Sequence, residues 1–473
     1  MVNAQPDPRA RVPDLPTTPA ILGCALLFIV SLAAGCATYH PLPLPRAARL
    51  APGLDRLELD IPAVASAPAG RVDTSRPLPV EQIGLLAILN DPDLRAQWGE
   101  RRLAEAGERQ ASLLPNPAVS INWEALVGGP GIQPNWSVSM TEDIASLITY
   151  HRRALAARAQ TEQVRASELW AEWQVAQKAR VLALDLYWGD RSVALSERER
   201  ALLERELTTV RRAVDAGNLD YTALAPLLAS QAALDQSLAA LRTTRESNWQ
   251  DLDALLGLAP GVRFPIAAPP EDAPPPPDVQ SLIDTLPQRR PDLVALELGY
   301  RSADETLRAA ILGQFPALAL GPIWEQDTTN IRSIGPTGTF DVPLFNRNQG
   351  QVAQARATRL MLREQYQARL DAALGEVRGL MALLERTRGD IARSRAAASA
   401  AERLAAAAHA AYDAGSLDQR SLADFESAAL ERELETAALE RTLAEAQVGL
   451  TVVLGIGLPQ TTLIVPDRVE AAR

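Results

Sequence analysis

The sequence feature that most limits the fold is an internal duplication. The hexapeptide DAGNLD at Asp215–Asp220 returns as DAGSLD at Asp413–Asp418, 198 residues later. The dipeptide Leu256-Gly257 returns as Leu454-Gly455 at the same spacing. Matches that keep one spacing across such a distance predict two copies of one structural unit. The two halves of the chain are therefore expected to share one fold.

The matching segments also set the domain boundaries. We assign the first repeat to residues 80–261 and the second to residues 281–459. Between them, residues 262–280 form a linker that contains FPIAAPPEDAPPPP, with seven prolines among fourteen residues. Such a composition excludes helix and favours a stiff, extended chain. A proline-rich, extended arm at residues 36–79 precedes the first repeat, and a tail at residues 460–473 follows the second.

The composition is typical of long helices. Ala and Leu dominate a hydrophobic content of 47%, aromatic residues make up only 4%, and charged residues of both signs make up 22%. The formal net charge is −11, and no basic stripe stands out in the sequence. Nucleic acid is therefore not expected as a partner.

Each repeat is predicted to open with a helix and a β-hairpin. In the first repeat the helix covers Ile88–Leu114 and stops at two prolines. Apolar residues that alternate with small polar ones then predict strands at about 117–124 and 135–142, joined by the turn GGPG. The same alternation predicts strands at about 316–325 and 331–342 in the equivalent place of the second repeat.

A very long helix is predicted after each hairpin, at about 150–214 in the first repeat and about 349–412 in the second. These stretches contain no proline and carry apolar residues at alternating spacings of three and four. About 65 residues at about 1.5 Å each give a rod of roughly 100 Å. Each rod ends at one of the repeated turns, from which a shorter helix returns.

The predicted strands present one apolar face. Four strands alone would leave unpaired edges and are too few to close on themselves. Alternation of apolar with small or polar residues is typical of a membrane β-barrel, so we expect several chains to pool their strands. A soluble hairpin packed on the helices is the alternative, in which the tryptophans are ordinary strand residues. The predicted membrane-facing residues are Trp123, Trp136, Leu318, Trp324 and Phe340.

The amino-terminal region resembles a bacterial lipoprotein signal. The unbroken apolar run Ala20–Ala34 is short for a membrane span and has the length of a signal-peptide core. It ends in LAAGC, with small residues directly before Cys36. The resemblance implies that residues 1–35 are a signal peptide and that Cys36 is lipidated. An uncleaved membrane anchor is the alternative.

The order of these parts resembles the TolC family of outer-membrane export ducts, over nearly all of the chain after the signal. Within that family, VPLFNRNQGQVAQARA at Val342–Ala357 is similar to the heavy-metal efflux subgroup typified by CzcC. The equivalent segment of the first repeat, Asp143–Ala159, looks like a degraded form of the subgroup's pattern and lacks its proline and both glycines.

The resemblance implies a mainly α fold with a membrane β-barrel. Three identical chains would form a homotrimer, with a twelve-stranded barrel in the outer membrane and a long α-helical barrel across the periplasm. The implied partners are outer-membrane lipid, a periplasmic adaptor (membrane fusion) protein and an inner-membrane pump of the RND type. The implied location is the outer membrane, with a lipid anchor on the periplasmic side.

The implied function is the outer-membrane factor of a tripartite efflux pump, a passive duct with heavy-metal cations as the candidate substrate. A drug-efflux or type I secretion duct is the alternative within this class. A structural coiled-coil lipoprotein of the periplasm, without a pore, is the alternative from another class. No enzyme activity or cofactor is expected, because no catalytic triad, P-loop or dinucleotide motif appears. No metal site is expected, because the histidines are scattered and lack a cysteine partner: His40, His151 and His409.

The repeated turns at the rod tips are candidate sites. Gly217 and Gly415 are suited to the left-handed conformation that ends a helix, and the polar residues beside them to capping the next helix. A helical hairpin needs such a turn with or without a partner, and the resemblance adds docking of the adaptor. The predicted docking residues are Gly217, Leu219, Asp220, Gly415, Leu417 and Asp418.

Asp424 is the candidate gate. It lies nine residues after Gly415 on the returning helix, at the position where the resemblance implies a gate aspartate. The first repeat has Pro226 there instead. Three such carboxylates around a narrow axis would favour cations. A solvated surface aspartate is the alternative.

Overall fold

The protein is described by a computed structural model that covers residues 39–61, 70–131, 133–270 and 278–456. The predicted signal peptide, Cys36 and the tail lie outside the described residues, as does the centre of the proline-rich linker.

The chain divides into two units, Met1–Arg49 and Leu50–Arg473. In the first unit, residues 39–49 are exposed and form neither helix nor strand. The helices and strands that follow all belong to the second unit.

The first repeat opens with two helices where one was expected. Helix α2 covers Val80–Asn90 and α3 covers Pro92–Ala111, so the prediction of one helix over Ile88–Leu114 was wrong. The chain breaks here because Pro92 has no N–H to donate and its ring clashes with the carbonyl one turn earlier. The Asp91 carboxylate caps the new helix by accepting from two backbone N–H groups, at 2.8 Å each.

The second repeat breaks at the same place. Helices α6 (Val279–Asp284) and α7 (Leu286–Arg289) are short, and α8 (Pro291–Leu312) begins at the counterpart of the first repeat's proline. In both repeats this proline is the first residue of the helix, a position whose N–H has no helical partner in any case. The duplication therefore extends to the helix boundaries.

The two long helices are α4 (Ile144–Asp215, 72 residues) and α9 (Gln349–Asp413, 65 residues). Helix α4 begins before the expected start near Tyr150, because Asp143 at the end of the preceding strand caps it directly. At about 1.5 Å per residue, α4 is about 110 Å long. No helix among the described residues is both long and apolar enough to cross a membrane.

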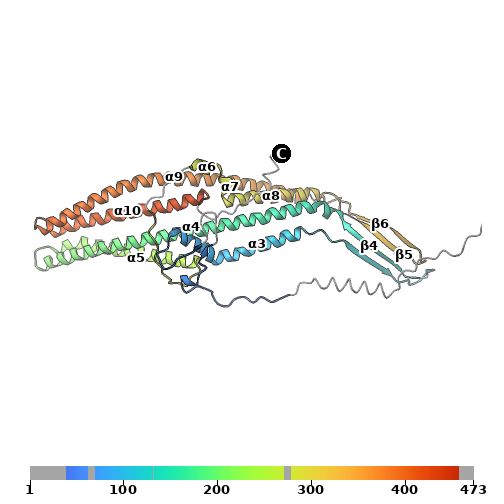
Figure 1. Cartoon of the computed structure of the whole chain (residues 1–473), viewed down its shortest axis with the longest axis horizontal. Coiled ribbons are helices and arrows are strands. Elements are labelled where there is room, and N and C mark those ends of the chain that lie inside the picture. The colour runs from blue at the N-terminus through green and yellow to red at the C-terminus, as the bar shows by residue number, and fades with distance from the viewer. Residues whose placement is uncertain (1–38, 62–69, 132, 271–277, 457–473) are drawn as a thin grey trace, which may run out of the picture. The chain divides into compact units, whose positions relative to one another are not determined.

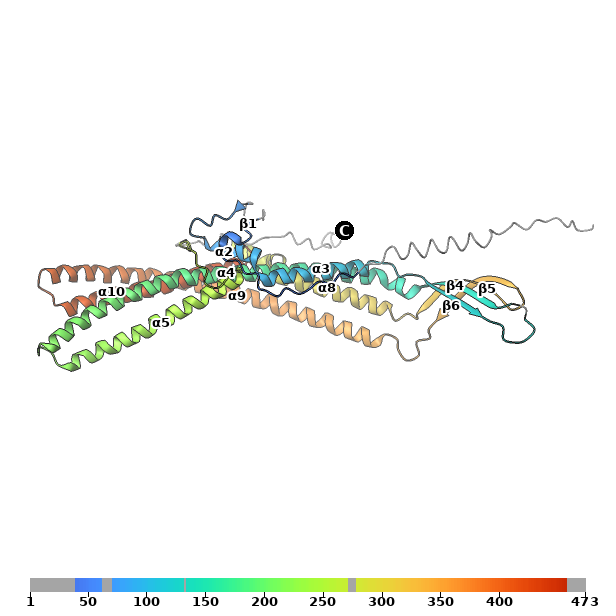
Figure 2. The same ribbon diagram turned by 90° about the horizontal axis from the view of Figure 1, so that it is seen from below.

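Each long helix is followed by a returning helix that packs against it. Helix α5 (Leu224–Leu255) contacts α4, and α10 (Gln419–Val453) contacts both α9 and α4. The four helices therefore lie in the order α5, α4, α10, α9, as Figures 1 and 2 show. Helix α8 packs against α4 and α9, while α2 and α3 pack against α4. The contact between α4 and α10 joins the first repeat to the second.

The strands form one antiparallel sheet in the order β3-β4-β5-β6 (Figure 1). Strand β4 of the first repeat pairs with β5 of the second, and Val138 lies opposite Trp324 in this register. The sheet is therefore a further junction between the repeats, besides the contacts of α4 with α8 and α10. Each strand begins and ends within about two residues of the bounds expected from alternation. The strands are β3 (Ala118–Glu124), β4 (Asn135–Asp143), β5 (Leu318–Gln326) and β6 (Arg332–Phe340).

Within the second unit, the arm contacts the chain that follows the helical hairpin of α4 and α5. Its residues Ala51 and Leu78 form parallel bridges with Leu258 and Ile266, which follow α5. The arm's secondary structure is the short helix η1 (Leu54–Arg56) and the paired strands β1 (Asp60–Ile61) and β2 (Gly70–Arg71). The arm contributes Leu59, Val72 and Leu78 to a buried core. The same core includes Trp188, Trp249 and Phe264.

Candidate functional site

The sheet has one apolar face and one polar face. Residues directly opposite each other share a face, and Trp123 lies opposite Trp136 while Trp324 lies opposite Ile334. All five predicted membrane-facing residues fall on the same face. The opposite face carries mainly Ser, Thr, Asn and Gly. The polar or charged residues Glu142, Gln326 and Arg332 lie on the apolar face near the strand ends. Its apolar residues are Val119, Ile121, Trp123, Trp136, Val138, Met140, Leu318, Leu320, Pro322, Trp324, Ile334, Pro336 and Phe340.

The apolar face is uncovered in the single chain. Trp123 is 66% exposed, Ile334 is 67% exposed and Phe340 is 56% exposed. An apolar surface of this extent marks a binding surface for another apolar phase or partner. Its pairing with a polar opposite face is the arrangement of a sheet that separates lipid from water.

Both edges of the sheet lack a partner strand among the described residues. Strand β3 pairs only with β4, and β6 pairs only with β5. Each edge therefore presents a row of free backbone N–H and C=O groups. A strand from another chain would satisfy them.

The two rod tips have the same backbone. Gly217 and Gly415 adopt positive φ angles of 75° and 69°. In each case the N–H of the next residue, Asn218 or Ser416, donates to the carbonyl five residues earlier, at 2.8 and 2.9 Å. This is the Schellman ending of a helix, for which glycine is favoured.

The helices that leave the tips begin differently. The Asp418 carboxylate caps α10 directly, by accepting from the backbone N–H groups of residues 420 and 421. Asp220 instead caps the short helix η2 (Tyr221–Ala223), and α5 starts only after it. Pro226 accounts for the difference, because its ring would clash with a helical carbonyl four residues earlier. Backbone hydrogen bonds lower the pKa of both aspartates.

The apolar residues of the two tips are unequally exposed. Leu219 is exposed, and so is Tyr221 beside it, whereas Leu417 is half-buried. All six predicted docking residues therefore lie at the tips, and Leu219 of the first tip is more exposed than Leu417 of the second.

Asp424 is exposed on α10, just past its first turn. It lies near Glu206 of α4. Burial raises the pKa of Glu206, the charge of Asp424 raises it further, and Arg420 opposes the shift. The candidate gate residue is therefore at the contact between α4 and α10.

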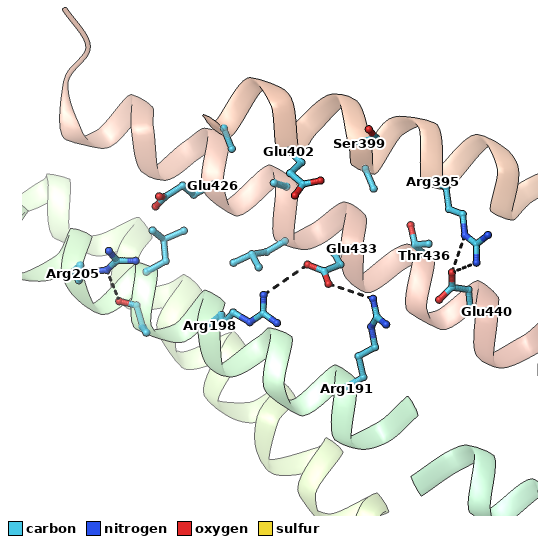
Figure 3. A pocket seen from close by; sticks show the side chains of 16 residues that line it. Arg191, Arg198, Arg205, Arg395, Ser399, Glu402, Glu426, Glu433, Thr436 and Glu440 are labelled. Atoms are coloured by element: carbon cyan, nitrogen blue, oxygen red, sulfur yellow. Dashed lines mark hydrogen bonds and ion pairs between the residues drawn. The ribbon is translucent and has the colours of Figure 1, made fainter. Parts of the chain in front are cut away.

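A groove of about 690 Å³ lies between α4, α9 and α10 (Figure 3). Glu433 of α10 pairs across it with Arg191 at 3.4 Å and with Arg198 at 4.0 Å, both on α4. A spacing of seven returns to almost the same side of a helix, so the charges form two facing rows. The rows are Arg191, Arg198 and Arg205 on α4, and Glu426, Glu433 and Glu440 on α10.

A second charge cluster lies at the same contact between α4 and α10. Arg441 is 2.7 Å from the Asp185 carboxylate and 2.6 Å from that of Glu445. Burial raises the pKa of Asp185 to about 7, and a hydrogen bond with Glu445 adds to this effect while Arg441 opposes it.

Both charge clusters were missed from the sequence. The spacing of seven between like charges was a usable signal for the first cluster. No pattern within α4 or α10 says which other helix each will contact, so the ion pairs themselves could not be foreseen. In the described part of the chain, no group of three or more His, Cys, Asp or Glu side chains is placed to hold a metal ion.

The second repeat matches a known family. Residues 282–456 match the family model described as "Outer membrane efflux protein". This segment runs from α6 to just past the end of α10 and includes β5, β6 and α9. A comparison with curated proteins found no significant match.

Solved structures share the fold over most of the chain. A membrane protein from Pseudomonas aeruginosa is 18% identical, with a TM-score of 0.67, and the match covers 91% of this chain and 100% of that one. The Campylobacter jejuni CmeC outer membrane channel is 15% identical, with a TM-score of 0.65 and coverage of 90% and 96%. The open state of the Neisseria gonorrhoeae MtrE outer membrane channel is 16% identical, with a TM-score of 0.65 and coverage of 88% and 100%.

Two of these structures, CmeC and MtrE, are outer membrane channels. Sequence identities of this size carry the fold and not the substrate. The chain has the fold of outer-membrane channels, and its second repeat carries the sequence pattern of the outer membrane efflux protein family.

Proposed function

We propose that the protein is a trimeric outer-membrane channel, the passive duct of a tripartite efflux pump. The observation that carries this proposal is the four-stranded sheet, with one exposed apolar face, one polar face and two unpaired edges. Neither an exposed apolar face nor open edges are stable in water. In a closed barrel in the membrane, lipid covers the apolar face and the edge strands pair with one another. Three copies would supply twelve strands, enough to enclose an aqueous path.

The edges provide the test of this assembly. Strand β3 of one copy would pair with β6 of the next. A cysteine at Ser120 of β3, combined in turn with one at Ser333, Gly335 or Thr337 of β6, should cross-link copies into covalent trimers in membranes. Ser139→Cys with Ile323→Cys is the control, because these positions are paired within one chain and should link no copies. Absence of covalent trimers in all three combinations would contradict the assembly.

The helical hairpins would form the periplasmic part of the duct. A helix of about 110 Å is long enough to reach far into the periplasm from a sheet held in the outer membrane. We assign docking of the periplasmic adaptor to the two tips, around Gly217, Leu219 and Asp220, and around Gly415, Leu417 and Asp418. Beyond the adaptor would lie an inner-membrane pump of the RND type. Charge or bulk at Leu219 should weaken adaptor binding measured with purified components.

Asp424 is proposed as the gate residue. Its support is its place near the tip of α10 and its closeness to Glu206 of α4. Three copies would bring three Asp424 carboxylates around the axis, where cations would bind and narrow the path. Asp424→Ala should raise conductance and weaken block by divalent cations. Unchanged conductance and block would assign Asp424 to the ordinary solvated surface.

Lipidation of Cys36 would anchor the duct on the periplasmic side of the outer membrane. The support is the sequence LAAGC alone. Mass spectrometry of the mature amino terminus should find an acylated cysteine, and an intact leader would favour the uncleaved anchor instead.

Heavy-metal cations are the proposed substrate class, on the strength of the segment Val342–Ala357. Drug efflux and type I secretion use ducts of the same kind and are the alternatives. A strain that lacks the protein should become sensitive to cobalt, zinc, cadmium or copper. Sensitivity to drugs alone, or loss of a secreted protein, would move the duct to one of the alternatives. If the protein is instead a structural coiled-coil lipoprotein without a pore, a strain that lacks it should show no loss of metal efflux, drug efflux or secretion.

A further inference from the structure

The two helical hairpins are near-copies, and this creates a pairing problem. Helix α10 is the duplicate of α5, and α9 is the duplicate of α4. Each returning helix therefore has two long helices that it could take as a hairpin partner, in its own chain or in a second copy. Exchange of equivalent elements is a known failure of repeat proteins and of assemblies. We use the term hybrid hairpin for α5 in the place of α10 against α9, or for α10 in the place of α5 against α4; the native side contact of α10 with α4 is not a hybrid hairpin.

One ion pair occurs at the same place in both hairpins, with its charges exchanged. Glu197 of α4 pairs with Arg242 of α5 at 2.7 Å. At the positions 198 residues later, Arg395 of α9 pairs with Glu440 of α10 at 2.6 Å. A hybrid hairpin would place Glu440 against Glu197, or Arg242 against Arg395. Like charges in contact destabilise helices by about as much as opposite charges stabilise them.

A second ion pair acts in the same direction. Asp190 of α4 pairs with Arg245 of α5 at 3.2 Å. The counterpart of Asp190 on α9 is Arg388. A hybrid of α9 with α5 would therefore bring Arg388 towards Arg245, which adds a second contact between like charges.

A buried polar contact beside the exchanged pair also favours α10 over α5 as the partner of α9. Ser394 of α9 and Thr436 of α10 share a hydrogen bond of 2.8 Å in the interior. The equivalent residues of the first hairpin are Ser196 and Leu238, both buried. In a hybrid of α9 with α5, the Ser394 hydroxyl would face Leu238 and lose its partner across the helices. In the other hybrid Ser196 would gain that partner, so this contact bears only on the choice of partner by α9.

We propose that these exchanged contacts form a pairing code that selects α10, and rejects α5, as the hairpin partner of α9. At the exchanged position Arg395 of α9 matches Glu440 of α10 and not Arg242 of α5, because the first hairpin carries the opposite arrangement there. Contacts that penalise a wrong partner are a general means of specificity in helix pairing. The code concerns how the duplicated chain folds and assembles, and it holds whatever the protein transports.

The charges distinguish α10 from α5 more strongly for α9 than for α4. On α4, Arg200 pairs with Asp235 of α5 at 2.8 Å, and the counterpart of Asp235 on α10 is Glu433, which is also acidic. This position therefore does not separate α5 from α10 as a partner for α4. The test accordingly follows the partner of α9.

The decisive variant exchanges the charges of the second hairpin only, Arg395→Glu with Glu440→Arg. It keeps an ion pair in each hairpin, so a purely stabilising role predicts no change. It removes the difference in sign between the hairpins. The full-length protein in membranes would carry either Ser394→Cys with Thr436→Cys, which reports the native hairpin, or Ser394→Cys with Leu238→Cys, which reports the hybrid. Mass spectrometry of the linked peptides identifies each disulfide.

We expect the ratio of hybrid to native cross-link to rise about fivefold in the exchanged variant, the effect of one exposed ion pair. Exchanging the first hairpin as well, by Glu197→Arg with Arg242→Glu, restores the difference in sign and should restore the original ratio. If the variant with four substitutions accumulates in cells as folded protein and the variant with two substitutions does not, this result would support the code equally. An unchanged ratio in the twofold variant, or the same defect in both variants, would overturn it.

Discussion

Glu433 of α10 forms an ion pair of 3.4 Å with Arg191 of α4, which ties the second repeat to the first along their helical hairpins. The same carboxylate lies 4.0 Å from Arg198, one heptad further along α4. Both arginines and the glutamate are partly exposed, so solvent weakens each pair.

The first prediction concerns this link. Glu433→Gln should lower the free energy of unfolding by about 0.5–1 kcal/mol, the range of partly exposed ion pairs. The loss should appear as a lower melting temperature in circular dichroism and should vanish in about 1 M salt, which screens exposed charges. Glu435→Gln is the matched control, because the ion pair of Glu435 is with Arg432 of its own helix. An equal loss in both variants would contradict a link between repeats.

The second prediction concerns the tips. Gly217→Ala and Gly415→Ala should each cost about 1 kcal/mol, because both glycines have positive φ angles that a Cβ disfavours. A Cβ at either site would meet no neighbouring atom within 4 Å, so the cost is one of backbone conformation. Gly189→Ala, in the middle of α4 with equally open space, should instead stabilise by about 0.5–1 kcal/mol. Thermal melting of the three variants distinguishes the signs.

The third prediction concerns the junction of the two strand pairs. A Cβ at Gly321 of β5 would lie 1.7 Å from the carbonyl oxygen of Met140 on β4, so Gly321→Ala must force these strands apart. The cost should be at least about 2 kcal/mol, as for an overpacked core. Gly335→Ala on β6 meets open space and is the control. Heat-resistant oligomers on gels should be lost in the first variant and kept in the second.

The fourth prediction concerns pH. Burial raises the pKa of the Glu172 carboxyl to about 7, the nearby Glu168 adds to this effect, and Arg101 opposes it. Because this pKa lies above its value in the unfolded chain, the folded state holds a proton that unfolding releases between about pH 4.5 and pH 7. Stability from this group therefore falls as pH rises through that window. Glu172→Gln should stabilise by about 1–3 kcal/mol at pH 8 and by almost nothing at pH 4.

Melting curves of wild type and Glu172→Gln across this range provide the measurement. A stabilisation that is the same at both pH values would show that the carboxyl is not held protonated by its surroundings.

The long helices and the hairpins were predictable because their signals are local. Absence of proline, apolar spacing and alternation all act within one element, and the repeated turn gave the positions of both tips. The break at Asp91 was missed because an Asp-Pro pair inside a helical pattern can either kink a helix or start a new one. The contact of α10 with α4 was also missed, since the pattern of α10 fits any long helix with a complementary face. Pairs such as Arg441 with Asp185 exist only once that neighbour is known.

The central claim is that this chain encloses an aqueous path through a membrane. Single-channel conductance of the purified protein in planar lipid bilayers tests it most directly. We expect discrete, stable conductance steps from wild type and from Gly335→Ala, and none from Gly321→Ala, whose Cβ forces β4 and β5 apart at Met140. A folded wild-type protein that gives no conductance steps, at any voltage and in the presence of its adaptor, would contradict the account.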